Sequence, residues 1–394
     1  MLYRRFGKTN INMPVISVGT MRFQTSWKRE DPVNPNSITN LEKIVQKAID
    51  SGMNHFETAH GYGTSEAELG TVLPNYDRDS LIIQTKVTPY ETTKEFLDTV
   101  DDCMKTLKVD YLDLLAVHGI NNAQLFDMTV RKDGILDACE KLKADGRIRH
   151  IGFSSHAQPD LITKAIQSDR FEFVNLWHSY IYQFNASAIA EAAKRDMGVF
   201  IISPNDKGGM LFDPPRKLCD LTAPLSPMMF NDIFTLSDPN IHTISCGAAV
   251  AENFDEHINA VDNLETHAEL VKQITDKLNA ELNGVIDADW INNCYTGLPH
   301  YTNTPGQANT FIIVWLWNLL KAFDLEKYTK YRFNLMGNAD HWFGGCKAET
   351  YKDIDKQLLR GSLKDSPYAD RIMDIIEEAQ VIMKADEVKR LGQD

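Results

Sequence analysis

The sequence predicts a closed (β/α)8 barrel, preceded by a β-hairpin and followed by an α-helical domain. Three observations support this: eight short apolar, β-branched runs, helical periodicity between most of them, and the end of such runs after about residue 270. Strands that alternate with helices form parallel sheets, and eight such units in roughly 250 residues favour a closed TIM barrel. A doubly wound α/β sheet with a helical tail is the structural alternative.

The first segment, LYRRFGKTNINMP from Leu2, predicts two short strands around Lys8-Thr9-Asn10 that form a hairpin across the barrel floor. Helical periodicity is clearest in ITNLEKIVQKAIDSG, before the second barrel strand, and TKEFLDTVDDCMKTLKV, before the fourth. The eight expected barrel strands are VISVG from Val15, NHFETA from Asn54, LIIQTK from Leu81, YLDLLAVH from Tyr111, RHIGFS from Arg149, FEFVNLW from Phe171, GVFIIS from Gly198 and IHTISC from Ile241.

A domain boundary is expected near Ala268, which divides the chain into a barrel of residues 1–267 and a helical appendage of residues 268–394. The appendage is interrupted by a Pro/Gly/Asn-rich stretch from Thr296 to Asn309. Its most apolar run, FIIVWLWNLL from Phe311, has ten residues. A bilayer requires about 20, so a buried helix is the better interpretation.

The composition is that of a soluble globular protein, with 43% hydrophobic and 24% charged residues among 394. A formal net charge of −14 argues against nucleic acid and membrane surfaces as partners and favours a small-molecule substrate. The six cysteines include no C-x-x-C pair, which is typical of a reducing compartment. The N-terminus shows no apolar signal segment, so a cytoplasmic location is expected.

Chemically active side chains follow three successive predicted strands: Tyr62 after the second, Lys86 at the end of the third and His118 after the fourth. In a parallel barrel these positions meet at the C-terminal mouth, where catalytic groups lie. Together the three groups suit proton donation to a carbonyl oxygen. A free tyrosine has a pKa of about 10, and a nearby ammonium is expected to lower it.

Other side chains at the strand ends permit different interpretations. Ser154, Ser155 and His156 could indicate a hydrolase, but a G-x-S-x-G elbow is absent and neighbouring residues on a strand face opposite ways. His55 and His60 could bind a metal, but no H-x-H pair accompanies them. We therefore expect no metal site.

The ordered motifs resemble the aldo-keto reductase family. FETAHGYGTSEAELG from Phe56 is similar to the family signature, and QTK and LAVHG fall on the next two strands. GFSSH from Gly152 resembles the stretch that holds the nicotinamide carboxamide, and SPNDKGG from Ser203 the pyrophosphate loop. GAAVAENFDEHINA from Gly247 resembles the loop and helix near the adenosine. The resemblance covers about residues 1–265.

The resemblance implies an NAD(P)H-dependent reduction of an aldehyde or ketone, without a G-x-G-x-x-G fingerprint. Tyr62 would donate the proton, Lys86 would lower its pKa, Glu57 would pair with Lys86, and His118 would orient the carbonyl. The residues expected to bind the cofactor are Ser154, Ser155, Asn175, Ser203, Pro204, Asn205, Lys207, Gly208, Gly247, Asn253, Glu256 and His257.

Three departures from the family pattern concern this site. Glu57 stands where the family usually has aspartate, and Leu176 follows Asn175 where the family often has glutamine. The segment from Gly247 to Ala260 offers only His257 as a basic group, although Lys207 could compensate. NADPH is expected through the resemblance, with NADH as the alternative.

The tail resembles the ferredoxin-like domain that some aldo-keto reductases carry, in which two C-x-x-C-x-x-C-x-x-x-C-P runs bind iron–sulfur clusters. Here Cys294 remains from the first run and Cys346, beside Asp340 and Phe343, from the second. Two thiolates cannot hold a four-cysteine cluster, so we expect a helical domain without a cluster.

Two other functions remain open at this point. A nicotinamide-binding sensor or partner-binding subunit with little catalysis would account for Glu57, Leu176 and the cysteine-poor tail. A metal-dependent hydrolase that uses Lys86 and His118 is the other.

Overall fold

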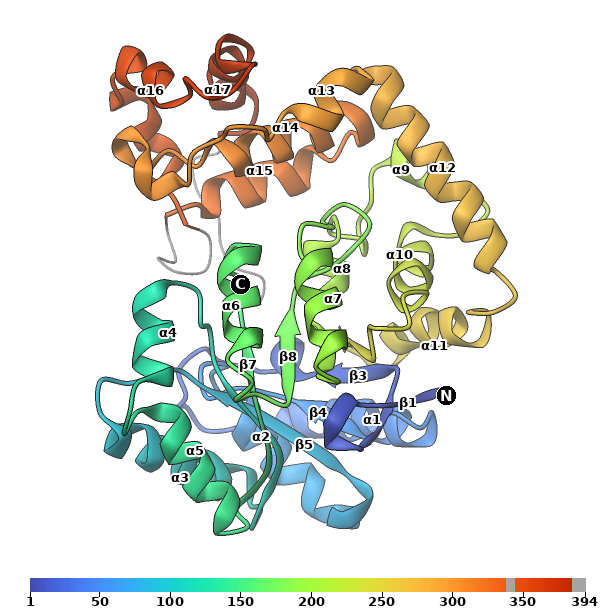
Figure 1. Ribbon diagram of the computed structural model, residues 1–394. Helices are drawn as coiled ribbons and strands as arrows, with labels where there is room; N and C mark the ends of the chain where they lie inside the picture. Colours follow the sequence, from blue (N-terminus) through green and yellow to red (C-terminus); the bar gives the residue numbers. More distant parts are fainter. Residues whose placement is uncertain (338–343, 385–394) are drawn as a thin grey trace. The chain divides into compact units, whose positions relative to one another are not determined.

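The N-terminal segment forms the expected hairpin. The computed structural model describes residues 1–337 and 344–384, and in it β1 (Tyr3–Arg5) pairs antiparallel with β2 (Asn12–Pro14). Phe6, between the two strands, is buried, and its ring centroid lies 5.8 Å from that of Phe173 in the barrel core. Phe6 and Met13 therefore contribute to the apolar core of the barrel. Figure 1 shows β1 next to the N-terminus of the chain.

Eight parallel strands close into a barrel in the order β10-β3-β4-β5-β6-β7-β8-β9. This confirms the predicted (β/α)8 barrel, and the open-sheet alternative is wrong. Each strand overlaps one of the eight predicted runs, and β5, β7 and β10 each extend one residue beyond theirs. The strands are β3 (Ile16–Gly19), β4 (His55–Glu57), β5 (Ile82–Val87), β6 (Leu112–Val117), β7 (Ile148–Ser154), β8 (Phe173–Leu176), β9 (Gly198–Ile201) and β10 (Thr243–Gly247).

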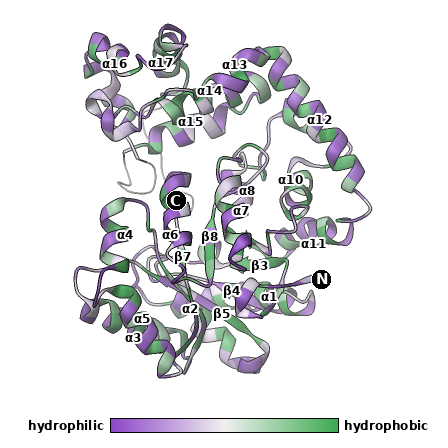
Figure 2. Ribbon diagram, viewed as in Figure 1, coloured by the Kyte–Doolittle hydropathy of each residue, from purple (hydrophilic) through white to green (hydrophobic). Residues whose placement is uncertain are grey.

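In the barrel part of the chain, the helix α1 (Pro35–Asp50) carries one apolar face. It begins at the side-chain cap of Asn34 and buries Leu41, Ile44, Val45 and Ala48, the spacing of one helical face (Figure 2). The other helices are α2 (Ser65–Val72), α3 (Thr93–Leu107), α4 (Ala123–Val130), α5 (Ile135–Ala144), α6 (Pro159–Gln167), α7 (Ala186–Lys194), α8 (Pro204–Lys207), α10 (Pro227–Leu236) and α11 (Asp255–Asp262).

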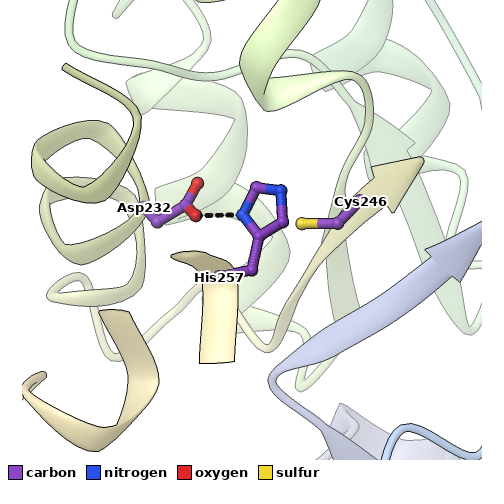
Figure 3. Close-up of side chains that lie close together, drawn as sticks. All are labelled: Asp232, Cys246 and His257. Atoms are coloured by element: carbon purple, nitrogen blue, oxygen red, sulfur yellow. Dashed lines mark hydrogen bonds and ion pairs between the residues drawn. The ribbon is translucent and has the colours of Figure 1, made fainter. Parts of the chain in front are cut away.

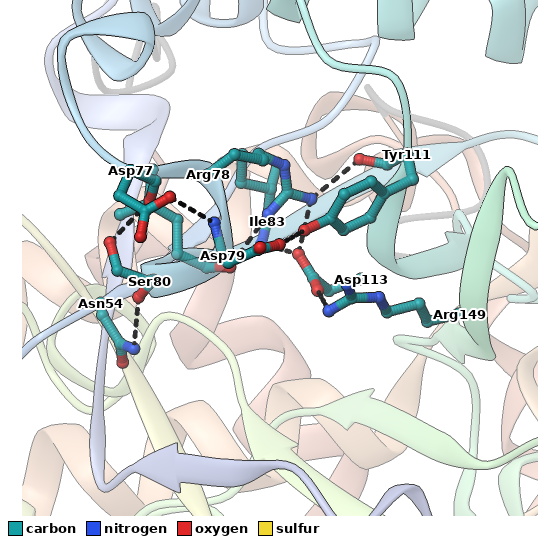
Figure 4. Close-up of polar contacts among 10 residues, drawn as sticks. Asn54, Asp77, Arg78, Asp79, Ser80, Ile83, Tyr111, Asp113 and Arg149 are labelled. Carbon is teal, nitrogen blue, oxygen red and sulfur yellow. Dashed lines mark hydrogen bonds and ion pairs between the residues drawn. The ribbon is translucent and has the colours of Figure 1, made fainter.

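A buried carboxylate ties strands together at the N-terminal end of the barrel. Asp113, the second residue of β6, is 2% exposed and pairs with Arg78 at 2.7 Å and Arg149 at 2.8 Å. It also accepts a hydrogen bond from the Ile83 backbone N–H of β5 at 2.9 Å (Figure 4). This network lies at the opposite strand ends from the predicted catalytic side chains.

The barrel interior contains a histidine on β4. His55 is fully buried, and its Nδ1 lies 2.6 Å from the hydroxyl of Ser17, which lies 2.7 Å from that of Thr243. Burial, assisted by the charge of Lys86, lowers the pKa of His55 to about 3. The imidazole is therefore neutral in the folded protein near pH 7.

We predict that His55 makes the fold sensitive to acid. Its folded pKa is below its unfolded value, so its contribution to stability is complete above about pH 6.5 and is lost as the pH falls toward 3, by about 1.4 kcal/mol per pH unit. Thermal melts of the wild type and of His55→Asn between pH 8 and 4 test this. The wild type should lose more of its melting temperature below pH 6.5, whereas the exposed control His300→Asn should follow the wild type. Parallel curves for the wild type and His55→Asn would contradict the prediction.

The described chain forms two compact units. The first contains Met1–Gly208 and Met228–Ala268, and the second contains Gly209–Pro227 and the described residues from Glu269 onward. The expected boundary near Ala268 coincides with the start of the longer segment of the second unit, whereas Gly209–Pro227 joins that unit from within the expected barrel domain. The assignment of residues 1–267 and 268–394 as domains stays a prediction.

The second unit is helical throughout its described part. Its core includes Trp290, whose Nε1 donates to Asn318 at 2.8 Å, and the predicted apolar run from Phe311 lies in one of its helices. Cys294 is buried, whereas Asp340 and Phe343 lie outside the described residues. Among the described helices, none is long and apolar enough to cross a bilayer. The helices are α9 (Arg216–Thr222), α12 (Ala268–Val285), α13 (Ala288–Asn293), α14 (Thr310–Phe323), α15 (Glu326–Leu335), α16 (Lys356–Ser362) and α17 (Ala369–Ile382).

Candidate active site

Four predicted catalytic residues lie at adjoining C-terminal strand ends. Glu57 is the last residue of β4, Tyr62 lies in the turn that follows, Lys86 is near the end of β5, and His118 directly follows β6. Lys86 is 1% exposed, Glu57 3% and His118 4%, while Tyr62 is half-buried. The parallel register of β4, β5 and β6 brings these positions to one mouth.

The four side chains are in contact. Lys86 Nζ forms an ion pair with Glu57 and donates to the backbone oxygen of Thr58 at 2.7 Å. The same Nζ lies 4.6 Å from the centroid of the Tyr62 ring. The rings of Tyr62 and His118 meet edge to face, with centroids 5.9 Å apart and planes at 85°. A phenol, an ammonium and an imidazole therefore lie next to one another.

The electrostatics correct one expectation. Lys86 was expected to lower the pKa of Tyr62, but burial raises the pKa of this phenol and also lowers that of the Lys86 ammonium well below its ordinary value. Both shifts have the same cause, since each charged form loses water. Tyr62 is therefore held as the neutral phenol, which is the form that can donate a proton.

The substitution of glutamate for the expected aspartate is accommodated by β10 and β3. Glu57 keeps its ion pair with Lys86, and its second oxygen accepts a hydrogen bond from Ser245 at 3.2 Å. A Cβ on Gly19 of β3 would lie 2.4 Å from the Ser245 hydroxyl, so this glycine leaves the space for it. The longer carboxylate thus remains paired on both oxygens.

The predicted nicotinamide residues lie at the ends of β7 and β8. Ser155 donates to the Ile120 backbone oxygen at 2.7 Å, so its hydroxyl is used within the turn. Ser154 accepts from the Gly119 N–H at 3.0 Å and keeps its own O–H for another partner. Asn175 is fully buried, and neither its amide oxygen nor its amide nitrogen has a hydrogen-bond partner. A buried amide with both atoms unpaired fits a second amide as ligand.

The predicted pyrophosphate loop, Ser203–Gly209, follows β9. Ser203 adopts the left-handed conformation, with φ 51°, and starts the single turn α8, which has Pro204 at its first position. Lys207 lies beside the end of β7, with Nζ 2.8 Å from His156 Nε2, and 5.8 Å from the Trp177 ring centroid beyond β8. The loop therefore brings a cation to the same mouth.

Three of the four residues predicted to bind the adenosine lie together on the loop and helix after β10. Gly247 ends β10, Glu256 is half-buried on α11, and the Asn253 side chain accepts the backbone N–H groups of Ala249 and Val250 at 3.0 and 3.2 Å. These three residues lie on one loop and the helix that follows it. Asn253 shapes the loop itself.

His257 does not fit its expected role. It is 1% exposed and its Nδ1 donates to Asp232, so its imidazole is unavailable to a phosphate in solvent. Burial opposes its charge, but Cys246 and Asp232 raise the pKa of His257 well above its ordinary value. The sequence showed its basic character but not its buried partner on α10.

Arg22 is a basic residue that the sequence analysis missed. It follows β3, and a Cβ on Gly247 would lie 2.7 Å from its Cγ. The sequence feature that could have identified Arg22 is its position directly after the first barrel strand. Arg22 therefore lies at the end of β10, where the adenosine loop begins.

Among the described residues, one group of three metal-type side chains occurs: Asp232, Cys246 and His257, whose ligand-type atoms lie within 4.8 Å of one another. Figure 3 shows the carboxylate and the thiol on opposite sides of the imidazole. Metal ligands instead converge on a single point. His55 and His60 do not belong to this group.

A closed parallel barrel with a phenol, a buried ion pair and an imidazole in contact at its C-terminal mouth is typical of a barrel enzyme. Residues 15–214 match the model of the aldo/keto reductase family. Because this match spans half of the chain, the chain belongs to the aldo/keto reductase family. Membership makes it an NAD(P)H-dependent oxidoreductase.

Similar proteins cover about 70% of this chain. L-glyceraldehyde 3-phosphate reductase from Escherichia coli O157:H7 is 22% identical over 341 residues, covering 72% of this chain and 94% of its own length. An aldo-keto reductase from Bacillus halodurans in its holo form has a TM-score of 0.59 at 19% identity, covering 70% and 96% of the two chains. One from Klebsiella pneumoniae in complex with NADPH has a TM-score of 0.56 at 19% identity, covering 69% and 93%.

Proposed function

We propose that this protein reduces an aldehyde or ketone to an alcohol with NADPH, and that Tyr62 is the proton donor. The observation that carries the proposal is the contact of Tyr62 with both Lys86 and His118 beside the buried ion pair of Lys86 with Glu57. These are the groups that proton transfer to a carbonyl oxygen requires.

The residues present fit a nicotinamide cofactor. The unpaired amide of Asn175 and the free O–H of Ser154 would hold the carboxamide. Ser203, Pro204, Asn205, Lys207 and Gly208 would hold the pyrophosphate, and Gly247, Asn253 and Glu256 the adenosine. Arg22 and Lys207 replace His257 as the cations that favour NADPH. When bound, the cofactor supplies the hydride.

The chain's own groups supply the proton and the geometry. His118 orients the substrate carbonyl toward Tyr62 and excludes water from one side. The carbonyl oxygen gains negative charge during reduction and takes the proton from the Tyr62 hydroxyl, because an alkoxide is a stronger base than a phenolate. Lys86 then stabilises the phenolate charge on Tyr62, and Glu57 keeps that ammonium in place.

A carbonyl panel with the purified protein tests this function. The panel should include short hydroxylated and phosphorylated aldehydes, in view of the relatives' names, together with aromatic aldehydes and ketones. Oxidation of NADPH with at least one carbonyl is expected. Saturable quenching of tryptophan fluorescence by NADPH without oxidation would favour the sensor, and stoichiometric zinc or iron in the purified protein would favour the hydrolase.

A further inference from the structure

Two adjacent buried residues of α10 are linked to the predicted pyrophosphate loop by hydrogen bonds. Asn231 is 2% exposed, its amide nitrogen donates to the backbone oxygen of Pro204 at 3.3 Å, and its amide oxygen accepts from the Tyr180 N–H at 3.1 Å. One side chain therefore joins the segment after β8 to the loop after β9.

Asp232 is linked to the same loop through a histidine. Its carboxylate accepts the Nδ1–H of His257 (Figure 3). The Nε2 of His257 lies 3.1 Å from the side-chain amide of Asn205. Asp232 is fully buried and His257 nearly so, which shields this row of groups from water. In such surroundings a hydrogen bond between charged groups is stronger than at the surface.

The loop requires such support from outside. Ser203 holds a left-handed φ that is unfavourable for a residue other than glycine, and α8 is a single turn of four residues. A helix of this length has no stability of its own. The two links to α10 fall on Pro204 and Asn205, directly after the strained residue.

We propose that Asn231 and Asp232 are positioning residues that hold the cofactor loop in its binding conformation, Asn231 directly and Asp232 through His257. The effect on cofactor binding rests on the proposed function. The effect of these hydrogen bonds on the loop conformation does not depend on the cofactor, so it can be measured in the cofactor-free protein.

The test compares Asp232→Ala and Asn231→Ala with the wild type by hydrogen–deuterium exchange of peptides that span residues 203–208, and by fluorescence titration with NADPH. Both variants should exchange faster in the loop, and Asp232→Ala should raise the Kd for NADPH about tenfold. Turnover at saturating NADPH should fall far less than affinity. Asp232→Asn retains an oxygen that accepts the Nδ1–H, so it should recover part of the affinity, and it serves as the test if Asp232→Ala does not fold.

Asp113→Ala is the matched control, because it removes a buried carboxylate from an ion-pair network at the other end of the barrel (Figure 4). It should lower the melting temperature without changing the Kd for NADPH or exchange in the loop. Unchanged loop exchange in Asp232→Ala and Asp232→Asn, or an equal loss of NADPH affinity in Asp113→Ala, would overturn the inference. A wild type that binds no NADPH would overturn the proposed function. Hydrogen–deuterium exchange of the loop would still show whether Asn231 and Asp232 hold its conformation.

Discussion

Replacing Tyr62 with phenylalanine is expected to lower kcat by about 10²- to 10⁴-fold, the range that a positioned general acid contributes. The substitution removes only the hydroxyl, and the ring can keep its edge-to-face contact with His118. Steady-state kinetics with the substrate found in the carbonyl panel measures the loss. Fluorescence titration should give a Kd for NADPH close to that of the wild type.

Tyr111→Phe is the control for this prediction. Tyr111 bonds Asp79 through its hydroxyl in the network at the N-terminal strand ends, away from the proposed reaction. Its loss should leave kcat unchanged. A Tyr62→Phe protein that kept wild-type turnover would exclude Tyr62 as the proton donor.

Replacing Glu57 with glutamine is expected to lower the free energy of unfolding by about 3–5 kcal/mol, because the substitution leaves a buried ammonium without its counter-charge. Lys86 is 1% exposed, so little water is available to compensate for the lost carboxylate. Urea denaturation at pH 7 measures this change. Turnover should also fall, since Glu57 no longer keeps the Lys86 ammonium in place beside Tyr62.

The double variant Glu57→Gln with Lys86→Met separates the two effects. Removing both members of a buried pair is often nearly neutral for stability, so the double variant should recover most of the lost free energy of unfolding. It should not recover turnover. A single variant Glu57→Gln as stable as the wild type would show that Lys86 carries no charge in the folded protein.

The eight barrel strands could be predicted because each one is buried on both faces. Strands of a parallel barrel are covered by helices outside and side chains inside, so they form apolar runs such as that of β9. The hairpin was also predictable from its turn residues. The inclusion of Gly209–Pro227 in the second unit was not, since it depends on contacts between residues far apart in the chain.

The catalytic candidates were predictable by position alone. Strand order brings Tyr62, Lys86 and His118 to one mouth once the barrel is known, and the structure places them in contact. The raised pKa of Tyr62 was not predictable, because it depends on how much water surrounds the phenol. The burial of His257 against Asp232 was missed for the same reason.

The sequence by itself therefore determined the barrel, its hairpin and the set of chemical groups at its mouth, because hydrophobic periodicity and strand order are properties of neighbouring residues. Only the tertiary structure decided which of these groups are paired, which are buried and which helix is hydrogen-bonded to the loop after β9. Charge and hydrogen bonding depend on partners that arrive from distant segments, as Ser245 does for Glu57 and Asp232 for His257.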